Sequence, residues 1–283
     1  MLRTRQVQAP ITEDFITAFK DCCILSKLDL NHGYHQFVTD PQSRQAMTFS
    51  TPWVNYRYKR LAFGGVNSQD LFDGEMEKIL SGIPRTLNNR DDIMIGGVDL
   101  ADHDKNLKIV LGRLKDYNLT LRQEKCEFRK STLEFHGHLF TAEGLKPSAS
   151  KVRAVNAFQK PNTKEELVSF LVAYLSRYID RFSGRCQPLR RLTKANTKFE
   201  WDPEQQRAFD DLKTALKTAP VLIPYQPGRE TLVIVDGSPE GLGGALLKKT
   251  ADGFQPVHYV SRTLTDTEKR YSQIEREALA AED

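Results

Sequence analysis

The chain has 283 residues, 39% of them hydrophobic, which is enough for about two domains with buried cores. Lys and Arg outnumber Asp and Glu by 41 to 37, and this net charge of +4 is compatible with a polyanionic partner but too small to require one. No apolar run approaches the ~20 residues that cross a bilayer, and the amino terminus lacks a secretory hydrophobic region. We therefore expect a soluble protein that is not exported and has no membrane partner.

The first half of the chain alternates short extended runs with amphipathic stretches. Residues 24–30, 45–50 and 56–63 are short extended runs that end in turn-forming residues, and we predict that they are strands of one sheet. Apolar residues recur at helical spacing over residues 68–80, and Asp99 is placed to cap a second helix. This pattern favours an α+β layer architecture in which helices cover a sheet.

The second half begins after a further extended pair, residues 119–122 and 132–140. Gly144 and Pro147 interrupt regular structure there, and we predict a domain boundary at this point. Helical segments follow, one of them ending at Pro161. The remaining predicted elements are a helix with Thr163 and Glu166 as a capping box, a helix that Asp202 caps before Pro203, strands at residues 231–236, 243–249 and 257–261, a hairpin turn at Asp252 and Gly253, and a helix at residues 273–281.

Two acidic points stand next to apolar strands. Asp29 lies inside one such strand, where a charge is costly unless it is paired, hydrated or bound to a metal. Asp91 and Asp92 form a doublet just before another strand, a pattern that taken alone is usually a solvated turn. Two divalent ions that assist phosphoryl transfer need bridging carboxylates from separate strands, and Mg²⁺ prefers such hard oxygen ligands.

A specific resemblance appears at this point. Residues 26–36, SKLDLNHGYHQ, resemble the first palm motif of reverse transcriptases from gypsy-like (Ty3-type) long-terminal-repeat retrotransposons. Further matches follow in the family's order. They are Phe63-Gly64 with Asn67, Asp91-Asp92, KCEF at residues 125–128, FHGH at 135–138 with Glu143-Gly144, Pro161, Phe170-Leu171, and FEW at 199–201.

The resemblance implies an RNA-directed DNA polymerase with an associated RNase H-type endonuclease. Asp29, Asp91 and Asp92 would be the catalytic metal ligands, with two Mg²⁺ ions at each active site and Mn²⁺ as a possible substitute. Tyr34 would lie beneath the sugar of the incoming dNTP, while Phe63, Gly64 and Asn67 would line the nucleotide and the template. The expected partners are an RNA template, a DNA primer, an RNA–DNA hybrid and dNTPs.

The carboxy-terminal part resembles the opening of a retroelement RNase H domain. Residues 233–238, VIVDGS, look like its first strand, whose Asp236 would bind a metal. In the helix at residues 273–281 the second catalytic carboxylate and metal ligand would be Glu277, with Glu275 as the alternative. We expect a right-hand polymerase palm with partial fingers at residues 1–142, a helical thumb or connection at 143–197 and part of an RNase H-like α/β domain at 198–283.

The chain departs from the family pattern before the acidic doublet. An aromatic residue is expected two positions ahead of Asp91, but Asn89 stands there, followed by Arg90. Arg90 either pairs with a carboxylate and competes with magnesium or points into solvent. We also expect the chain to be truncated at both ends, in the fingers and in the nuclease. These departures leave an alternative, a catalytically inactive relic that binds nucleic acid or serves only within a longer polyprotein.

Other candidate sites have weaker signals. Arginines at positions 177, 181, 185, 190 and 191, interleaved with Tyr174, Tyr178 and Phe182, suit either a phosphate-tracking surface or a solvated face with core aromatics. His136 and His138 alternate on a predicted strand and, with Cys126, suggest a zinc site that lacks a fourth ligand. Neither a Ser/His/Asp signature nor a phosphate-binding loop is evident.

The cysteine pattern indicates the redox compartment. The four residues, Cys22, Cys23, Cys126 and Cys186, follow no repeating spacing and form no CxxC pair. Such usage is typical of reduced thiols. We expect an intracellular protein of the cytoplasm or nucleus, and its oligomeric state cannot be read from the sequence.

Overall fold

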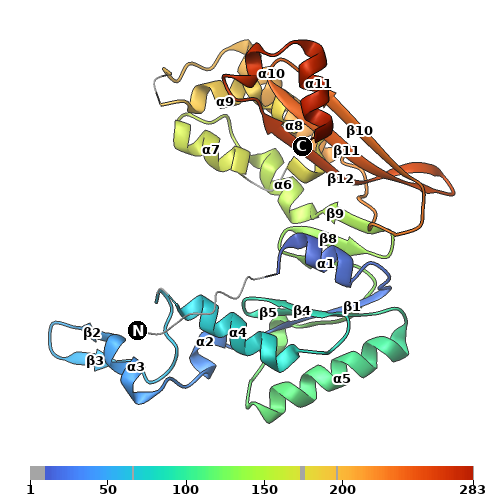
Figure 1. Ribbon diagram of the computed structural model, residues 1–283. Helices are drawn as coiled ribbons and strands as arrows, with labels where there is room; N and C mark the ends of the chain where they lie inside the picture. Colours follow the sequence, from blue (N-terminus) through green and yellow to red (C-terminus); the bar gives the residue numbers. More distant parts are fainter. Residues whose placement is uncertain (1–9, 66, 173–175, 196, 283) are drawn as a thin grey trace. The chain divides into compact units, whose positions relative to one another are not determined.

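The computed structural model describes residues 10–65, 67–172, 176–195 and 197–282 (Figure 1). The chain divides into two compact units, Met1–Leu133 and Glu134–Asp283. Within the described ranges, none of the helices combines the length and the apolar character that crossing a bilayer needs.

The first unit is built on a four-stranded antiparallel sheet with the strand order β4-β5-β1-β6. These strands are β4 Thr86–Asn89, β5 Asp92–Gly97, β1 Ile24–Asp29 and β6 Glu127–Lys130. Helices α4 Ser68–Leu80 and α5 Leu100–Asp116 pack on one face of it (Figure 1). Leu28, Ile93 and Ile95 from the sheet meet Met76 and Val110 from the helices in the core. This packing confirms helices that cover a sheet.

Local signals explain where the two long helices begin and end. The apolar spacing over residues 68–80 predicts a helix with the same bounds as α4. Asp99 caps α5 as predicted, since its Oδ1 accepts a hydrogen bond from the Asp102 backbone N–H at 2.8 Å. Both helix predictions are therefore confirmed.

The prediction of one sheet containing residues 45–50 and 56–63 is wrong. Strands β2 Thr48–Ser50 and β3 Asn55–Arg57 pair only with each other. Helix α3 Pro41–Ala46 occupies the start of the first run, because Asp40 caps the Gln42 and Ser43 N–H groups and Pro41 suits the first helical turn. Two further short helices were not predicted, α1 Thr12–Ala18 and α2 Gly33–Gln36.

The predicted extended pair at residues 119–122 and 132–140 is only partly right. Leu121 forms an isolated bridge with Leu30, a 3₁₀ turn η1 covers Gln123–Lys125, and β6 takes the sheet edge instead. The second run is broken by a turn in which His136 and Gly137 have φ of 48° and 80°. It becomes β7 Leu133–Phe135 and β8 His138–Thr141, which form a small sheet with β9 Gly144–Pro147.

The hairpin of β8 and β9 lies where the sequence suggests a domain boundary. Gly144 has φ of 141°, and a Cβ there would lie 2.3 Å from the Leu222 carbonyl oxygen, so only glycine fits. The two compact units separate after Leu133, nine residues before the predicted end of the first domain at residue 142. The division into three domains stays a prediction.

A helical layer follows in the second unit. It contains α6 Ala149–Ala157, α7 Lys164–Val172, η2 Ser176–Tyr178, α8 Phe182–Arg185, α9 Gln187–Thr193 and α10 Pro203–Lys217. As predicted, α10 starts with Asp202 as its cap and Pro203 in its first turn. Its buried side chains include Phe209 and Leu212, and the Phe209 ring packs on Phe170 of α7 at 4.7 Å.

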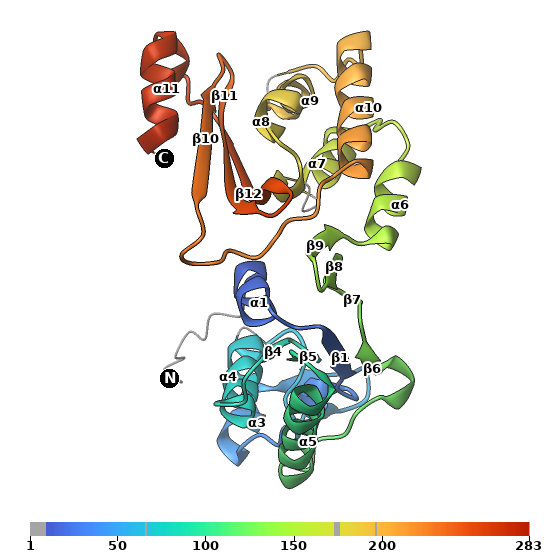
Figure 2. The same cartoon turned by 90° about the vertical axis from the view of Figure 1, so that its right-hand side faces the viewer.

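The second unit ends in a three-stranded antiparallel sheet and a helix, as predicted. The strands β10 Thr231–Gly237, β11 Gly241–Thr250 and β12 Gly253–Thr263 lie in that order, so β10 is an edge strand. Helix α11 Gln273–Glu282 and helix α8 lie on opposite faces of this sheet (Figure 2). An η3 turn, Glu268–Arg270, precedes α11.

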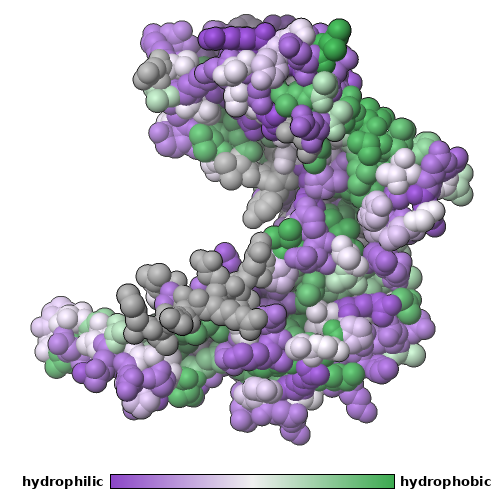
Figure 3. All heavy atoms as spheres, in the orientation of Figure 1, coloured by the Kyte–Doolittle hydropathy of each residue, from purple (hydrophilic) through white to green (hydrophobic). Residues whose placement is uncertain are grey.

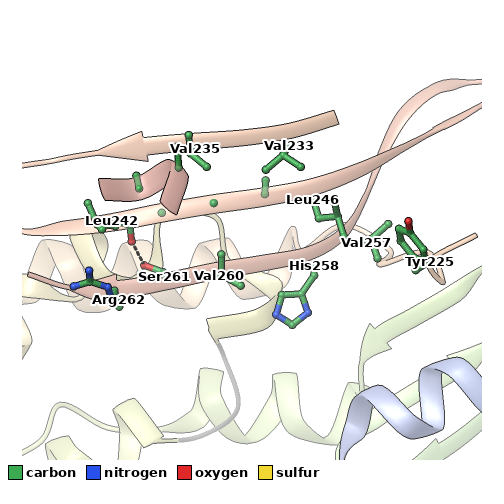
Figure 4. A pocket seen from close by; sticks show the side chains of 15 residues that line it. Tyr225, Val233, Val235, Leu242, Leu246, Val257, His258, Val260, Ser261 and Arg262 are labelled. Carbon is green, nitrogen blue, oxygen red and sulfur yellow. Dashed lines mark hydrogen bonds between the residues drawn. The ribbon is translucent and has the colours of Figure 1, made fainter. Parts of the chain in front are cut away.

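An apolar pocket of about 800 Å³ lies on the α11 face of this sheet. Val233 and Val235 of β10, Leu246 of β11 and Val260 of β12 point into it (Figure 4). Hydrophobic residues also gather on the molecular surface over these strands (Figure 3). The described part of this unit therefore leaves much of one sheet face uncovered.

Candidate functional site

The register of the first sheet brings two of the predicted carboxylates together. Asp29 is the last residue of β1 and pairs directly with Asp92, the first residue of β5. Side chains of directly opposed residues lie on the same face, with Cβ atoms about 4.5–5.5 Å apart. Asp91 immediately precedes Asp92, and its carbonyl oxygen accepts a hydrogen bond from the Leu30 N–H at 2.9 Å. The three aspartates thus gather at one end of the sheet.

The Asp91 carboxyl group is held in a constrained place. Its Oδ1 is buried and has no hydrogen-bond partner among the described residues. A Cβ on Gly33 would lie 2.4 Å from this oxygen, so the glycine leaves room for it. Burial raises the pKa of Asp91, and the neighbouring charges of Asp29 and Asp92 raise it further. The site therefore concentrates negative charge that a cation would relieve.

Two basic side chains act on this acidic cluster. The Lys125 ammonium lies 3.4 Å from Asp29 Oδ2, so Lys125 belongs to the site. The sequence placed Lys125 in the KCEF motif but gave it no role. Arg90 lies in the turn between β4 and β5 with φ of 54°, is exposed, and forms no ion pair with any described residue. It still lowers the pKa of Asp91, although less than Lys125 does. Neither expectation for Arg90 holds fully, since it is solvated and yet acts on a carboxylate.

Of the residues predicted to line the nucleotide, Phe63 lies next to Tyr34. The Tyr34 ring in α2 is buried and stacks on Phe72 at 4.7 Å, while the exposed Phe63 ring lies 4.6 Å away on a neighbouring turn. Gly64 has φ of 80° in that turn, and Asn67 precedes the first residue of α4. The structure therefore brings Tyr34 and Phe63 together and places the other two residues on the same connection.

The carboxylate oxygens of the three aspartates suit a hard divalent cation, although they do not form a complete coordination sphere by themselves. Across the described ranges, no three His, Cys, Asp or Glu side chains are arranged to hold a metal ion by themselves. Asp29 is turned toward Lys125, whereas Asp91 Oδ1 lacks any partner. Carboxylate oxygens suit Mg²⁺, which commonly takes few protein ligands together with water and substrate phosphates. Asp29, Asp91 and Asp92 are thus compatible with a site that substrate completes.

The two carboxylates predicted for the nuclease contact different partners. A Cβ on Gly237 would meet the backbone of Arg276 in α11 at 2.9 Å, so position 237 faces that helix. Asp236 must face the opposite side of β10, because side chains alternate along a strand. There its Oδ2 lies 3.2 Å from Arg181 Nε. On α11, Gln273 Nε2 donates to Glu277 Oε1 at 2.8 Å and to the Gly237 carbonyl oxygen at 2.7 Å, so Glu277 lies close to the residue that follows Asp236.

The alternative Glu275 is also occupied locally. Its carboxylate accepts a hydrogen bond from the Ser272 N–H at 2.7 Å, and this contact lowers its pKa. Glu275 therefore caps the amino-terminal end of α11.

Two family models match the chain. Residues 3–140 match "Reverse transcriptase (RNA-dependent DNA polymerase)", and residues 201–282 match "RNase H-like domain found in reverse transcriptase". The Pol polyprotein from transposon 297 of Drosophila melanogaster is 31% identical over 280 residues, which cover 96% of this chain and 26% of that protein. The chain therefore carries a reverse transcriptase domain followed by an RNase H-like domain, and it is similar to retrotransposon Pol polyproteins.

Further relatives agree with this similarity. The transposon 412 Pol polyprotein of Drosophila melanogaster is 33% identical, and the transposon Tf2-3 polyprotein of Schizosaccharomyces pombe is 29% identical. Each alignment covers 96% of this chain, and the chain spans only 22% and 21% of the respective relatives. The chain therefore spans about a quarter or less of each relative's length.

Solved structures share the reverse transcriptase fold. The foamy viral protease-reverse transcriptase dRH in complex with ds DNA has a TM-score of 0.86 at 22% identity and covers 97% of this chain and 49% of its own. The foamy viral protease-reverse transcriptase in complex with RNA/DNA hybrid has a TM-score of 0.85 at 22% identity and covers 97% and 38%. The predicted polymerase fold class is confirmed.

The basic helical segment of the second unit buries its described aromatic side chains and does not offer them for stacking. Tyr178 and Phe182 are buried, which supports the core-packing interpretation of the aromatic spacing. Arg181 and Arg185 pair with Asp236 and Asp211. Tyr174 lies outside the described residues.

The predicted shared face of His136 and His138 is wrong. His136 lies in the turn between β7 and β8, whereas the buried His138 Nδ1 pairs with the Tyr178 hydroxyl. Cys126 instead donates its thiol to the Arg122 carbonyl oxygen at 3.4 Å. The zinc interpretation gains no support from these positions.

A buried polar chain in the reverse transcriptase unit was missed from the sequence. Ser26 Oγ lies 2.8 Å from His103 Nε2, and His103 Nδ1 lies 3.0 Å from Asp104 Oδ1. Ser26 and His103 are fully buried, and Ser26 Oγ also accepts from the Arg129 N–H at 3.0 Å. A nucleophile needs access to a substrate, and the buried Ser26 has none. These hydrogen bonds instead connect β1, α5 and β6.

Proposed function

We propose that the chain provides the polymerase palm of an RNA-directed DNA polymerase, a nucleotidyltransferase, in which Asp29, Asp91 and Asp92 hold Mg²⁺, or Mn²⁺ in its place. The observation that carries this proposal is the direct pairing of Asp29 with Asp92 at the strand end beside Asp91. Carboxylates from two strands are the arrangement that a pair of divalent ions requires.

The chain's own residues have distinct tasks in this reaction. When bound, the two cations make the primer 3′-hydroxyl a better nucleophile and neutralise charge on the transferred phosphoryl group. The three aspartates hold the cations, and Lys125 limits the repulsion that the Asp29 charge adds to the cluster. The buried ring of Tyr34 forms a rigid wall for the sugar of the incoming nucleotide.

The proposed substrates are dNTPs, an RNA template and a DNA primer. The foamy viral enzymes of the same fold are described in complexes with double-stranded DNA and with an RNA/DNA hybrid, which supports nucleic acid as the partner class. We also propose that the protein works inside the cell, in the cytoplasm or the nucleus. The four cysteines are free thiols, in keeping with that setting.

A primer-extension assay tests the polymerase proposal. The purified chain is given an RNA template, a DNA primer, dNTPs and either Mg²⁺ or Mn²⁺. We expect extension by the wild type and a loss of at least about 100-fold in Asp29→Asn, because each metal contact supplies several kcal/mol in the transition state. Asp116→Asn, an exposed change at the end of α5, is the matched control. No extension by the wild type, or equal extension by Asp29→Asn, would overturn the proposal.

Endonucleolytic hydrolysis of the RNA strand in an RNA–DNA hybrid is a second candidate, favoured by the RNase H-like match at residues 201–282. Asp236 would be its metal ligand, and the ion pair with Arg181 would have to open first. Asp236→Asn should abolish hybrid cleavage, and unchanged cleavage would exclude that role. A catalytically inactive relic is not favoured, because both family models match and the polymerase carboxylates meet.

A further inference from the structure

A hydrogen-bond chain in the first unit connects Tyr34 to helix α4. The Tyr34 hydroxyl donates to Gln69 Oε1, and Gln69 Nε2 donates to Asp73 Oδ2 at 2.7 Å. Gln69 and Asp73 lie four residues apart, on the side of α4 that also presents Phe72 to the Tyr34 ring. One helix face therefore supplies both the stacking partner and the hydrogen bonds of this tyrosine.

In this hydrogen-bond chain, the donor and the acceptor of each bond are determined. An ionised carboxylate only accepts, so the Gln69 amide must turn its NH₂ group toward Asp73 and its oxygen toward Tyr34. The Tyr34 hydroxyl must then donate to Gln69 and has no proton left for a ligand. The ring is clamped by stacking on Phe72, with an interplanar angle of 12°, and by this hydrogen bond at its far end.

The carboxylate of Asp73 is energetically unfavourable at this buried position. Its side chain is almost wholly buried, at 5% exposure, and its Oδ1 has no partner among the described residues. Burial raises the pKa of Asp73, while the hydrogen bond from Gln69 lowers it. Burying a carboxylate with one oxygen unsatisfied is unfavourable. An apolar residue would suit the core better, so the carboxylate is explained by its contact with Gln69.

We propose that Gln69 and Asp73 are positioning residues that hold the Tyr34 ring in place and thereby set selectivity for deoxyribonucleotides over ribonucleotides. This inference rests on the proposed polymerase function and on the place of Tyr34 beneath the sugar. The ring is held by stacking on Phe72 and by the hydrogen bond of its hydroxyl to Gln69, so the space left for the sugar has a defined volume. A ring released from Gln69 can shift, and the discrimination against an additional 2′-hydroxyl then weakens.

Single-nucleotide incorporation tests the inference through the ratio of kcat/KM for a dNTP to kcat/KM for the matching rNTP. Gln69→Leu and Asp73→Ala should each lower this ratio about two- to tenfold, the range expected for one lost hydrogen bond. Asp73→Asn should stay close to the wild type, because its amide oxygen still accepts from Gln69. Gln45→Leu makes the same chemical change at an exposed position of α3 and should have no effect.

A second background separates positioning from general damage. In Tyr34→Phe the hydroxyl is absent, so adding Gln69→Leu should not lower the ratio further. If the wild type extends primers but Gln69→Leu leaves the ratio unchanged, or lowers it equally in the Tyr34→Phe background, the inference is wrong and the polymerase function stands.

Absence of extension by the wild type has a different meaning, because the polymerase proposal and the selectivity claim would then fall together. Urea unfolding still decides whether the hydrogen-bond chain exists. Tyr34→Phe and Gln69→Leu should shift the unfolding midpoint less than additively, since both remove the same bond. Additive shifts would show that the two side chains do not interact.

Discussion

Asp29 and Asp92 lie directly opposite each other where β1 and β5 end, so two like charges share one face of the sheet. Such a pair destabilises a sheet by about 0.2–1 kcal/mol. We therefore expect Asp92→Asn to raise the free energy of unfolding by about this amount while it removes primer extension. Urea unfolding without divalent ions measures the first effect, and Asp116→Asn should change neither quantity. A less stable Asp92→Asn protein would contradict the proposed repulsion.

Arg90 should weaken divalent-ion binding at this cluster. Its guanidinium is exposed and lowers the pKa of Asp91, so it repels an added cation. Arg90→Ala should lower the Mg²⁺ concentration for half-maximal extension about fivefold, which corresponds to an interaction on the order of 1 kcal/mol. Lys108→Ala removes an exposed charge from α5 and serves as the control. An unchanged or higher Mg²⁺ requirement in Arg90→Ala would refute this role.

Sequence signals predicted the elements that local chemistry determines. Asp99 and the pair Asp202-Pro203 mark helix starts that the structure confirms, since caps and first-turn prolines act within a few residues. The convergence of Asp29 with Asp92 was also within reach, because the ordered motifs implied neighbouring strands. The helix that begins at Pro41 was missed although Asp40 supplies the same kind of cap.

Two kinds of feature could not be predicted from the sequence. One is the face of a strand on which a side chain lies, and the other is packing between distant segments. Nothing local distinguishes Asp236 on the α8 face of β10 from an aspartate on the α11 face. Lys125 meets Asp29 across 96 residues of chain, and the bond from Tyr34 to Gln69 spans 35. Such contacts follow from the tertiary fold and leave no signal in the local sequence.

The buried pair of Ser26 and His103 should contribute to the stability of the first unit. Ser26→Ala would leave His103 Nε2 and the Arg129 N–H without this partner, and a buried unsatisfied group costs about 1–3 kcal/mol. We expect a loss of that size in urea unfolding, with little loss from Ser81→Ala, an exposed position. Equal stability of the two variants would show that the hydrogen bonds add little.

Glu268 should make the second unit sensitive to acid. Its carboxylate accepts from Arg262 at 2.9 and 3.0 Å and from the Thr265 N–H, and these bonds lower its pKa from 4.5 to about 2. A lowered folded-state pKa contributes stability that is present above the unfolded value of 4.5 and is lost as the pH falls toward about 2.

The corresponding measurement compares the melting temperatures of the wild type and Glu268→Gln between about pH 6 and pH 2.5. The wild type should melt higher near the upper end, and its advantage should shrink through this window. An advantage that is independent of pH would contradict the ion pair as its source.

The uncovered apolar face of the second unit should make the isolated chain prone to association. Val233 is 62% exposed on the edge strand β10, beside a pocket lined by Val235 and Val260. Exposed, apolar edge strands are templates for pairing with other chains, and an edge lysine opposes this. Val233→Lys should therefore lower light scattering of the concentrated protein without lowering its melting temperature. Val98→Lys makes the same exchange at an exposed position of the first unit and should leave scattering unchanged. Equal scattering by the wild type and Val233→Lys would place the associating surface elsewhere.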